Sequence, residues 1–330
     1  MTSGDAKPRS PRRALVFGGG GVLGGTWAVG ALTAWQEETG LDPVDVDIIV
    51  GTSAGSVLAA LVACGVSTDE LITHYRDEPV TTGPLAGYEW DPDRATGGKR
   101  PGRPKLRGPG SPALIRSSLR NLGQLPATAV LSAFLPEGGK SLERVGHLID
   151  AVTPLGEWSA HPNLWVVATD YSDGHRVVFG RPGAPVAPLA SAVMASCAIP
   201  GWFTPVDIAG RTYIDGGAVS ATSVDVLAHT GVDEVYVIAP MVSFETDSPS
   251  SIQARLERRW RAQVTKVCRD EMALLRAAGA SVYAIGPGPQ DLEAIGANLM
   301  DARRRQLVLD TSLRTSTQVW HEQLGQSLAG

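Results

Sequence analysis

The serine at position 53 stands in a setting that suits a nucleophile. It lies in Gly51-Thr52-Ser53-Ala54-Gly55, a GxSxG pattern between a buried strand expected at 47–50 and an apolar helix expected at 56–64. A serine on a sharp strand-to-helix turn holds its hydroxyl clear of a sheet, and the flanking glycines relieve crowding there. Unpaired N–H groups at the helix N-terminus favour negative charge on a substrate carbonyl oxygen. The pattern predicts a nucleophilic Ser53; the alternative is a serine N-cap in a tight turn.

A run of bare glycines forms the second candidate element. Gly18-Gly19-Gly20-Gly21 follows the apolar strand expected at 13–17 and precedes a helix expected to end near Gly40. Successive glycine N–H groups can converge on one anionic point. Since this run lies one strand away from Ser53, we expect Gly19, Gly20 and Gly21, together with Ala54, to form an oxyanion hole.

The same glycines also fit a dinucleotide-binding pattern. Gly19, Gly21 and Gly24 have the spacing GxGxxG. That function needs an acidic residue at the end of the second strand to hold a ribose. Here the second strand ends in Gly51-Thr52-Ser53, and Asp47 stands at its start. A nucleotide-binding oxidoreductase is therefore the least favoured hypothesis.

A candidate base lies far along the chain. Asp215 ends a short apolar strand in Ile214-Asp215-Gly216-Gly217. An aspartate within hydrogen-bond reach of a serine hydroxyl can act as a general base, although a turn aspartate is the simpler alternative. The order Ser53, Asp215, His321 matches the triad order of α/β-hydrolases. Because the serine here follows only the second strand, a two-residue Ser–Asp pair is favoured over a triad.

The elements that must position these residues alternate between strands and helices. A strand, a glycine turn and a helix occur twice in succession, which predicts an α/β fold with parallel strands. Further strands are expected at 164–168, 176–179, 211–214, 234–238 and 281–285, and further helices at 112–123, 140–151, 187–197, 250–278 and 301–323.

The chain divides by composition into three parts. Polar residues with Pro8 and Pro11 predict a disordered tail at 1–12. Residues 13–240 form the expected hydrolase domain, interrupted by a Pro/Gly-rich insertion at about 79–112. Residues 241–330 are expected to be a helical and strand extension packed on the same domain. A hydrophobic fraction of 43% and a charged fraction of 19% are those of a globular protein.

Charge is unevenly distributed. Residues 94–120 carry eight Lys or Arg and no acid, although the net charge of the chain is −5. A basic segment on an acidic body favours peripheral contact with an anionic membrane surface; a solvated loop is the alternative. Three widely spaced cysteines show no metal-binding pattern, and no apolar run approaches the roughly 20 residues of a membrane span. We expect a cytoplasmic protein, peripheral at most on the inner face of the membrane, without nucleic-acid partners and with a homodimer as an option.

The ordered motifs together resemble the patatin-like phospholipase family. The glycine loop, GxSxG and Asp-Gly-Gly occur in that family's order, and 195–206 and 169–179 resemble its remaining segments, so the resemblance covers about 13–240. It implies a three-layer α/β/α fold with a mainly parallel central sheet and helices on both faces. It also implies Ser53 as nucleophile, Asp215 as base, Gly19–Gly21 as oxyanion loop, and no metal or organic cofactor. One departure is Leu23, where the family usually carries Arg or Lys.

Two functions follow as hypotheses. The first is a serine lipid acyl hydrolase that cleaves carboxylic esters of phospholipids or related lipids through an acyl-enzyme. The second, motivated by Leu23, is a catalytically weak lipid-binding or regulatory module on the same fold.

Overall fold

A mixed β-sheet lies at the centre of the computed structural model, which describes residues 9–89, 100, 110–120, 125–153, 157–245 and 252–325. The described strands run in the spatial order β5-β6-β3-β2-β1-β7-β8, with β4 also paired to β3. Their bounds are β1 Arg13–Phe17, β2 Ile48–Thr52, β3 Leu164–Asp170, β4 Arg176–Phe179, β5 Val206–Ile208, β6 Arg211–Asp215, β7 Glu234–Ile238 and β8 Ser281–Ile285. β3, β2, β1, β7 and β8 are parallel to one another, and β4, β5 and β6 supply the antiparallel pairings.

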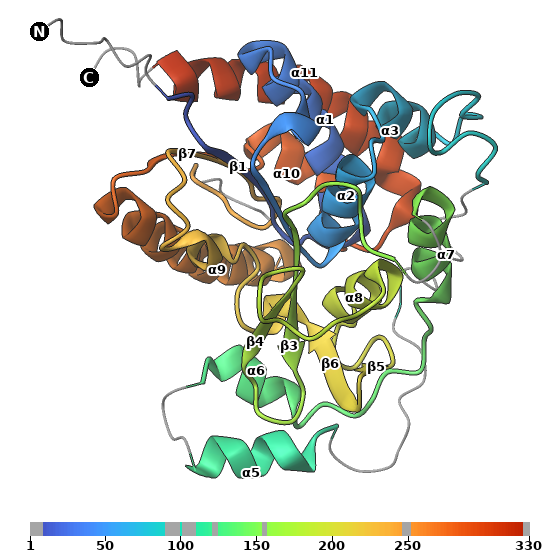
Figure 1. Ribbon diagram of the computed structural model, residues 1–330, viewed down its shortest axis with the longest axis vertical. Helices are drawn as coiled ribbons and strands as arrows, with labels where there is room; N and C mark the ends of the chain where they lie inside the picture. The colour runs from blue at the N-terminus through green and yellow to red at the C-terminus, as the bar shows by residue number, and fades with distance from the viewer. Residues whose placement is uncertain are drawn as a thin grey trace, which may run out of the picture.

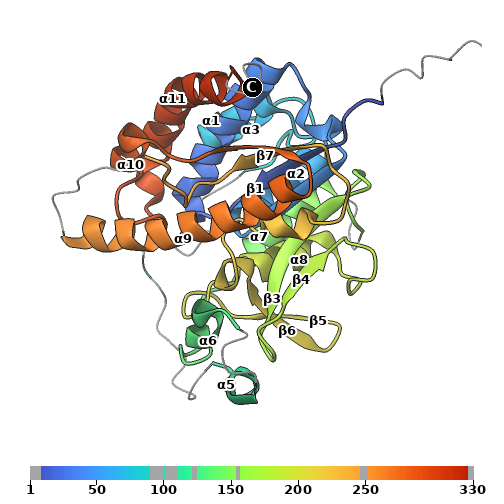
Figure 2. The same cartoon turned by 90° about the vertical axis from the view of Figure 1, so that its left-hand side faces the viewer.

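Helices cover both faces of this sheet, as Figures 1 and 2 show. Alternate residues of a strand point to opposite faces: Leu15 and Phe17 of β1 enter one core, and Ala14 and Val16 enter the other. The first core contains side chains from α1 Gly21–Thr39, α2 Ala54–Ala63, α3 Thr68–Tyr75, α7 Glu143–Val152, α8 Leu189–Ser196, α10 Pro289–Ile295 and α11 Arg305–Gly325. The second lies beneath α9 Ile252–Ala277 and the 3-10 turn η3 Val224–Leu227. The expected three-layer, mainly parallel α/β/α fold is confirmed.

Short elements account for most differences from the sequence-based expectation. A small third core combines Leu114 of α5 Pro112–Arg120 with Ala133, which directly follows α6 Ala127–Ser132, and with Tyr171 and Ile214. The remaining 3-10 turns are η1 Pro43–Asp45, η2 Gly216–Ala218 and η4 Ala302–Arg304. The sequence-based expectation did not include β5, α6 or α10. The two helices among them have six and seven residues, which is less than about two helical turns and too short for a helical period to be recognised.

The last part of the chain completes the same sheet and core. β8 pairs with β7, and α11 packs along α1, where the Trp320 Nε1 donates to the Ala31 carbonyl at 2.9 Å. The Ser312 hydroxyl donates to the Trp27 carbonyl at 2.7 Å. Within the described ranges, no helix is both long enough and apolar enough to cross a bilayer.

Two expectations fall largely on undescribed parts of the chain. Residues 1–8 of the expected disordered tail lie outside the described residues, whereas Arg9 pairs with Asp233 at 2.9 Å. Residues 90–99 and 101–109 lie outside them as well, and they contain most of the Pro/Gly-rich insertion and five of the eight cations of the basic segment 94–120. Arg100, between the two ranges, is described.

Candidate active site

Ser53 occupies a strained turn between β2 and α2. Its φ of 54° and ψ of −129° place a non-glycine residue in the positive-φ region, directly before the first residue of α2. Such conformations cost free energy and persist only where the surrounding structure enforces them. The turn lifts the serine hydroxyl off the carboxyl end of β2, as the GxSxG pattern predicts.

Asp215 lies against that hydroxyl. The Ser53 Oγ donates to Asp215 Oδ2 at 2.6 Å, although the two residues are 162 positions apart in sequence. They meet because β2 and β6 both flank β3, parallel and antiparallel respectively. Ser53 is 7% exposed and Asp215 is 5% exposed, so bulk water does not screen this contact. The structure therefore brings the two predicted residues together in the geometry that a nucleophile–base pair requires.

The environment of Asp215 sets its acidity. Burial raises the pKa of its carboxyl to about 6, against the opposing effects of the Ser53 hydroxyl and the Gly217 N–H. That N–H donates to Asp215 Oδ1 at 2.7 Å, so each carboxylate oxygen has a fixed partner. A carboxylate with this pKa is a better proton acceptor than an ordinary aspartate and remains ionised at neutral pH.

A buried serine on α8 holds the strained turn in place. The Ser196 Oγ accepts from the Ser53 N–H at 2.8 Å and donates to the Val167 carbonyl of β3 at 2.6 Å. The Ser53 carbonyl accepts from both the N–H and the hydroxyl of Ser56, each at 2.7 Å. Sequence reasoning did not identify Ser196 as a site residue, although it lies in the segment 195–206 that resembles the family.

The glycine loop lies beside Ser53, with one difference from expectation. A side chain added at Gly19 would come within 3.1 Å of the Ser53 Cβ. The Gly19 N–H, however, donates to the Ala221 carbonyl at 2.8 Å, which corrects its predicted use as an oxyanion donor. Among the described residues, no hydrogen bond occupies the N–H of Gly20, Gly21 or Ala54.

The other motif glycines allow close backbone packing. A Cβ at Gly55 would lie 2.2 Å from the Phe17 carbonyl oxygen, so only glycine lets the start of α2 rest on the end of β1. Gly51 and Gly216 are similarly confined, by Ser56 and by the Val167 carbonyl. Gly21 adopts a φ of 62°, which favours glycine where the loop enters α1.

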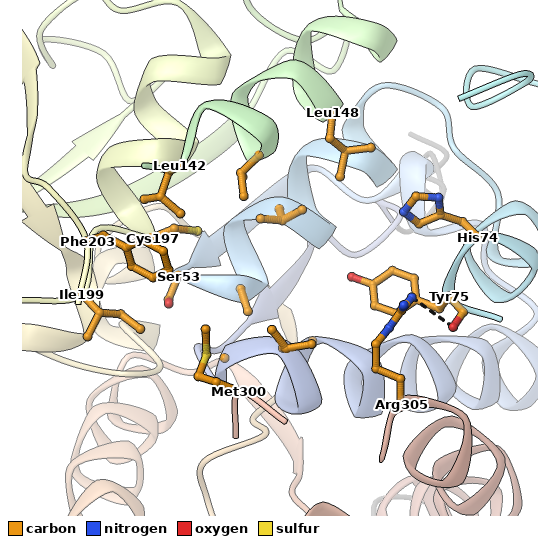
Figure 3. Close-up of a pocket in the computed structure, with 16 residues that line it drawn as sticks. Ser53, His74, Tyr75, Leu142, Leu148, Cys197, Ile199, Phe203, Met300 and Arg305 are labelled. Carbon is orange, nitrogen blue, oxygen red and sulfur yellow. Dashed lines mark hydrogen bonds between the residues drawn. The ribbon is translucent and has the colours of Figure 1, made fainter. Parts of the chain in front are cut away.

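A largely apolar pocket extends from Ser53 (Figure 3). Its lining side chains come from elements scattered along the chain, namely Val22, Val57, Leu142, Val145, Leu148, Cys197, Ile199, Phe203 and Met300. Met300 belongs to the part of the chain after residue 240, for which the sequence indicated no definite role. A largely apolar pocket that is lined by Ser53 suits a hydrocarbon chain.

Polar groups close the far end of the pocket, away from Ser53 (Figure 3). The Arg305 guanidinium donates to Asp77 Oδ1 at 2.8 Å and to the Tyr75 carbonyl at 3.0 Å. Burial, reinforced by the Arg305 charge, lowers the pKa of His74 to about 4, so this imidazole is neutral at physiological pH. None of the sequence motifs identified His74 as a pocket residue.

Two residues considered in the sequence analysis, His321 and Leu23, lie outside the candidate site. His321 is exposed and contacts Glu38 at 3.1 Å, so it takes no part in the Ser53–Asp215 contact. Leu23 is fully buried in the core on the α1 side of the sheet and does not line the pocket. The family position that usually carries a cation is therefore used here for packing.

Comparison with known proteins gives one family and several solved structures. Residues 15–228 match the model of the family described as patatin-like phospholipase. VipD from Legionella pneumophila is similar with a TM-score of 0.44 and 14% identity, over 95% of this chain and 67% of VipD. The type III effector protein ExoU matches with a TM-score of 0.35 and 17% identity, over 96% of this chain and 54% of ExoU. The ExoU–SpcU complex of Pseudomonas aeruginosa gives a TM-score of 0.32 and 20% identity, over 80% of this chain and 52% of that chain. This chain thus spans about half the length of the ExoU chains that it matches.

Proposed function

This chain belongs to the patatin-like phospholipase family, and on that premise we propose that it is a serine lipid acyl hydrolase acting through Ser53 and Asp215. The observation that carries the proposal is the 2.6 Å hydrogen bond to Asp215 Oδ2 from the Oγ of Ser53, a residue that lines an apolar pocket. The family match supports hydrolysis of lipid esters. The roles of Ser53 as nucleophile and Asp215 as base are part of the proposal.

Acylation begins at Ser53. Asp215 Oδ2 takes the hydroxyl proton while Oγ attacks the ester carbonyl carbon, giving a tetrahedral oxyanion. The unoccupied N–H groups of Gly20, Gly21 and Ala54 are the proposed donors to that oxyanion, aided by the N-terminal dipole of α2. Collapse of the intermediate breaks the ester C–O bond, and the leaving alkoxide takes the proton back from Asp215.

Deacylation repeats these steps with water as nucleophile. Asp215 accepts a proton from water as the water oxygen attacks the acyl carbon on Ser53. The second tetrahedral intermediate expels the Ser53 oxygen, which recovers the proton from Asp215, and a carboxylic acid leaves. No other base is needed, because one carboxylate serves both half-reactions in turn.

The pocket indicates which part of the substrate is recognised. Its apolar lining between Ser53 and Leu148 would hold the acyl chain, with the scissile carbonyl at Ser53. With Leu23 buried in the core, the glycine loop presents no side-chain cation from that position to a headgroup. We therefore propose that the acyl chain contributes more to substrate selection than a phosphate does.

Activity-based labelling and a substrate panel test this function. Wild-type protein should react with a fluorophosphonate probe and hydrolyse phospholipids, lysolipids, acylglycerols or short esters. Ser53→Ala should lose labelling completely, and both Ser53→Ala and Asp215→Asn should lose on the order of 10⁴-fold or more in kcat/KM.

A buried serine remote from the site provides the control. Ser316 of α11 is 2% exposed and contacts Ser312, so Ser316→Ala should label and turn over like the wild type. If the folded wild type neither labels nor hydrolyses any of these esters, the lipid-binding module becomes the better description.

A further inference from the structure

One end of α9 projects beyond the sheet. The Arg261 Nη1 donates to the Pro240 carbonyl at 2.6 Å, which places residue 261 level with the end of β7. Thr265 is tied to Ser243, and Glu271 to Thr222, so the helix crosses the sheet from residue 261 onward. Residues 252–260 therefore extend about 13 Å past the carboxyl edge. Figure 2 shows this lighter orange end of α9 reaching away from the sheet.

The projecting end exposes apolar side chains in a helical stripe. Ile252 is 83% exposed, Leu256 is 68% exposed and Trp260 is 53% exposed. Their spacing of four residues places them along one side of the helix. Large apolar side chains on a helix face that packs into a core are normally buried. A cluster of exposed ones therefore marks an interaction surface.

Cations flank this stripe. Arg255 and Arg259 are exposed on the same turns of the helix. The acid of this segment, Glu257, is turned inward and bonded to Arg258 and Arg261. The outward surface therefore combines apolar groups, an aromatic ring and positive charge, which is the composition of a helix lying in the interface of an anionic bilayer.

The stripe is coupled to the candidate active site through one residue. Pro240, which Arg261 holds through its carbonyl, packs against the glycine loop, because a Cβ added at Gly20 would meet the Pro240 Cβ at 2.7 Å. Trp260 is the residue adjacent to Arg261. Insertion of Trp260 into a lipid layer would therefore also fix the distance between that layer and the glycine loop.

We propose that residues 252–260 of α9 dock the protein on an anionic lipid bilayer, with Ile252, Leu256 and Trp260 inserted and Arg255 and Arg259 at the headgroups. This surface differs from the basic segment 94–120 and needs no turnover at Ser53. Arginine pairs with lipid phosphate and carboxylate groups, whereas a second copy of this helix would oppose cation to cation. That charge pattern is why a bilayer is favoured over a dimer.

Vesicle co-sedimentation of the full chain carrying Ser53→Ala tests the proposal without lipid turnover. Ser53→Ala should bind vesicles of phosphatidylcholine mixed with phosphatidylserine more tightly than pure phosphatidylcholine. Adding Leu256→Asp with Trp260→Ala should weaken binding at least about tenfold. Arg255→Glu with Arg259→Glu should weaken binding to the anionic vesicles by about fivefold or more per arginine, with little effect on the neutral ones.

A matched control lies on the same helix. Leu274 is 59% exposed but is located over the sheet, so Leu274→Asp should leave binding within about twofold of the parent. Thermal unfolding verifies that each α9 variant is folded. Hydrolysis of a monomeric short ester by the same α9 variants, with Ser53 intact, separates failure of docking from failure of the proposed chemistry. The proposal would be overturned if the variant with Leu256→Asp and Trp260→Ala bound vesicles as tightly as its parent, or if the two substitutions abolished self-association instead of vesicle binding.

Discussion

At the scale of single residues, the site depends on one strained backbone conformation and the hydrogen bonds that enforce it. Ser53 has a positive φ, and its N–H and carbonyl are held by Ser196 and Ser56 respectively. Both supporting serines are fully buried. Because buried hydrogen bonds are costly to leave unmade, they fix the direction of the Ser53 hydroxyl toward Asp215.

The acidity of Asp215 predicts a pH dependence for the reaction. The carboxyl must be ionised to accept the Ser53 proton, and burial raises its pKa to about 6. We expect kcat/KM for a soluble short ester to be constant above that pH and to fall about tenfold per pH unit below it. A rate profile that stays flat down to pH values near 4 would contradict the assignment of Asp215 as the base; circular dichroism at each pH excludes unfolding as the cause.

At the scale of elements, the N-terminal end of α2 carries the proposed nucleophile, and the helix also forms a wall of the pocket. Val57 lies one turn after Ser53 on the same helix face, and it lines the pocket. α7 supplies further apolar side chains of the same lining, Val145 and Leu148. A chain of methylene groups leaving Ser53 must therefore pass Val57.

Enlarging Val57 should shorten the acyl chains that the enzyme accepts. We expect Val57→Phe to lower kcat/KM for long-chain esters about tenfold or more and to change short-chain esters less than about twofold, because only the long chain meets the added ring. The measurement is the ratio of the two rates. Val130→Phe, the same substitution at a half-buried position of α6 outside the pocket, should leave that ratio unchanged. Equal losses for both chain lengths in Val57→Phe would contradict this route for the acyl chain.

At the scale of the whole molecule, the face of the sheet opposite the pocket supports the glycine loop. Glu271 of α9 accepts from the Thr222 hydroxyl at 2.6 Å and from the Val224 N–H at 3.0 Å. The carbonyl of Ala221, the residue directly before Thr222, accepts from the Gly19 N–H at 2.8 Å. One buried carboxylate on α9 therefore anchors the segment on which the glycine loop rests.

This anchor should make the free energy of unfolding depend on pH. Burial, together with the charge of Asp225, raises the pKa of Glu271 from 4.5 to about 7. Between these values the folded state retains a proton that the unfolded state releases, so stability falls as the pH rises through the window. Urea titrations at several pH values should show a steeper fall for the wild type than for Glu271→Gln. Parallel curves for the two proteins would refute this role.

The sequence by itself determined the local features of the site. The GxSxG turn, the glycine loop and the Asp-Gly-Gly strand end were all identifiable, because strand-to-helix turns impose residue types on neighbouring positions. The alternation of strands and helices likewise indicated a mainly parallel sheet between helical layers. These properties depend on interactions within a few residues or within one repeating unit of structure.

The tertiary structure decided what depends on contacts between distant residues. The Gly19 N–H bonds to Ala221, and the Ser53 N–H bonds to Ser196, neither of which any local pattern encodes. The pocket is lined by side chains from Val22 to Arg305. The exposed stripe of α9 follows from the position of Arg261 level with the end of the sheet, which leaves residues 252–260 beyond it. Hydrogen-bond partners and exposed surfaces follow from packing across the whole chain, so these features could be read only from the fold.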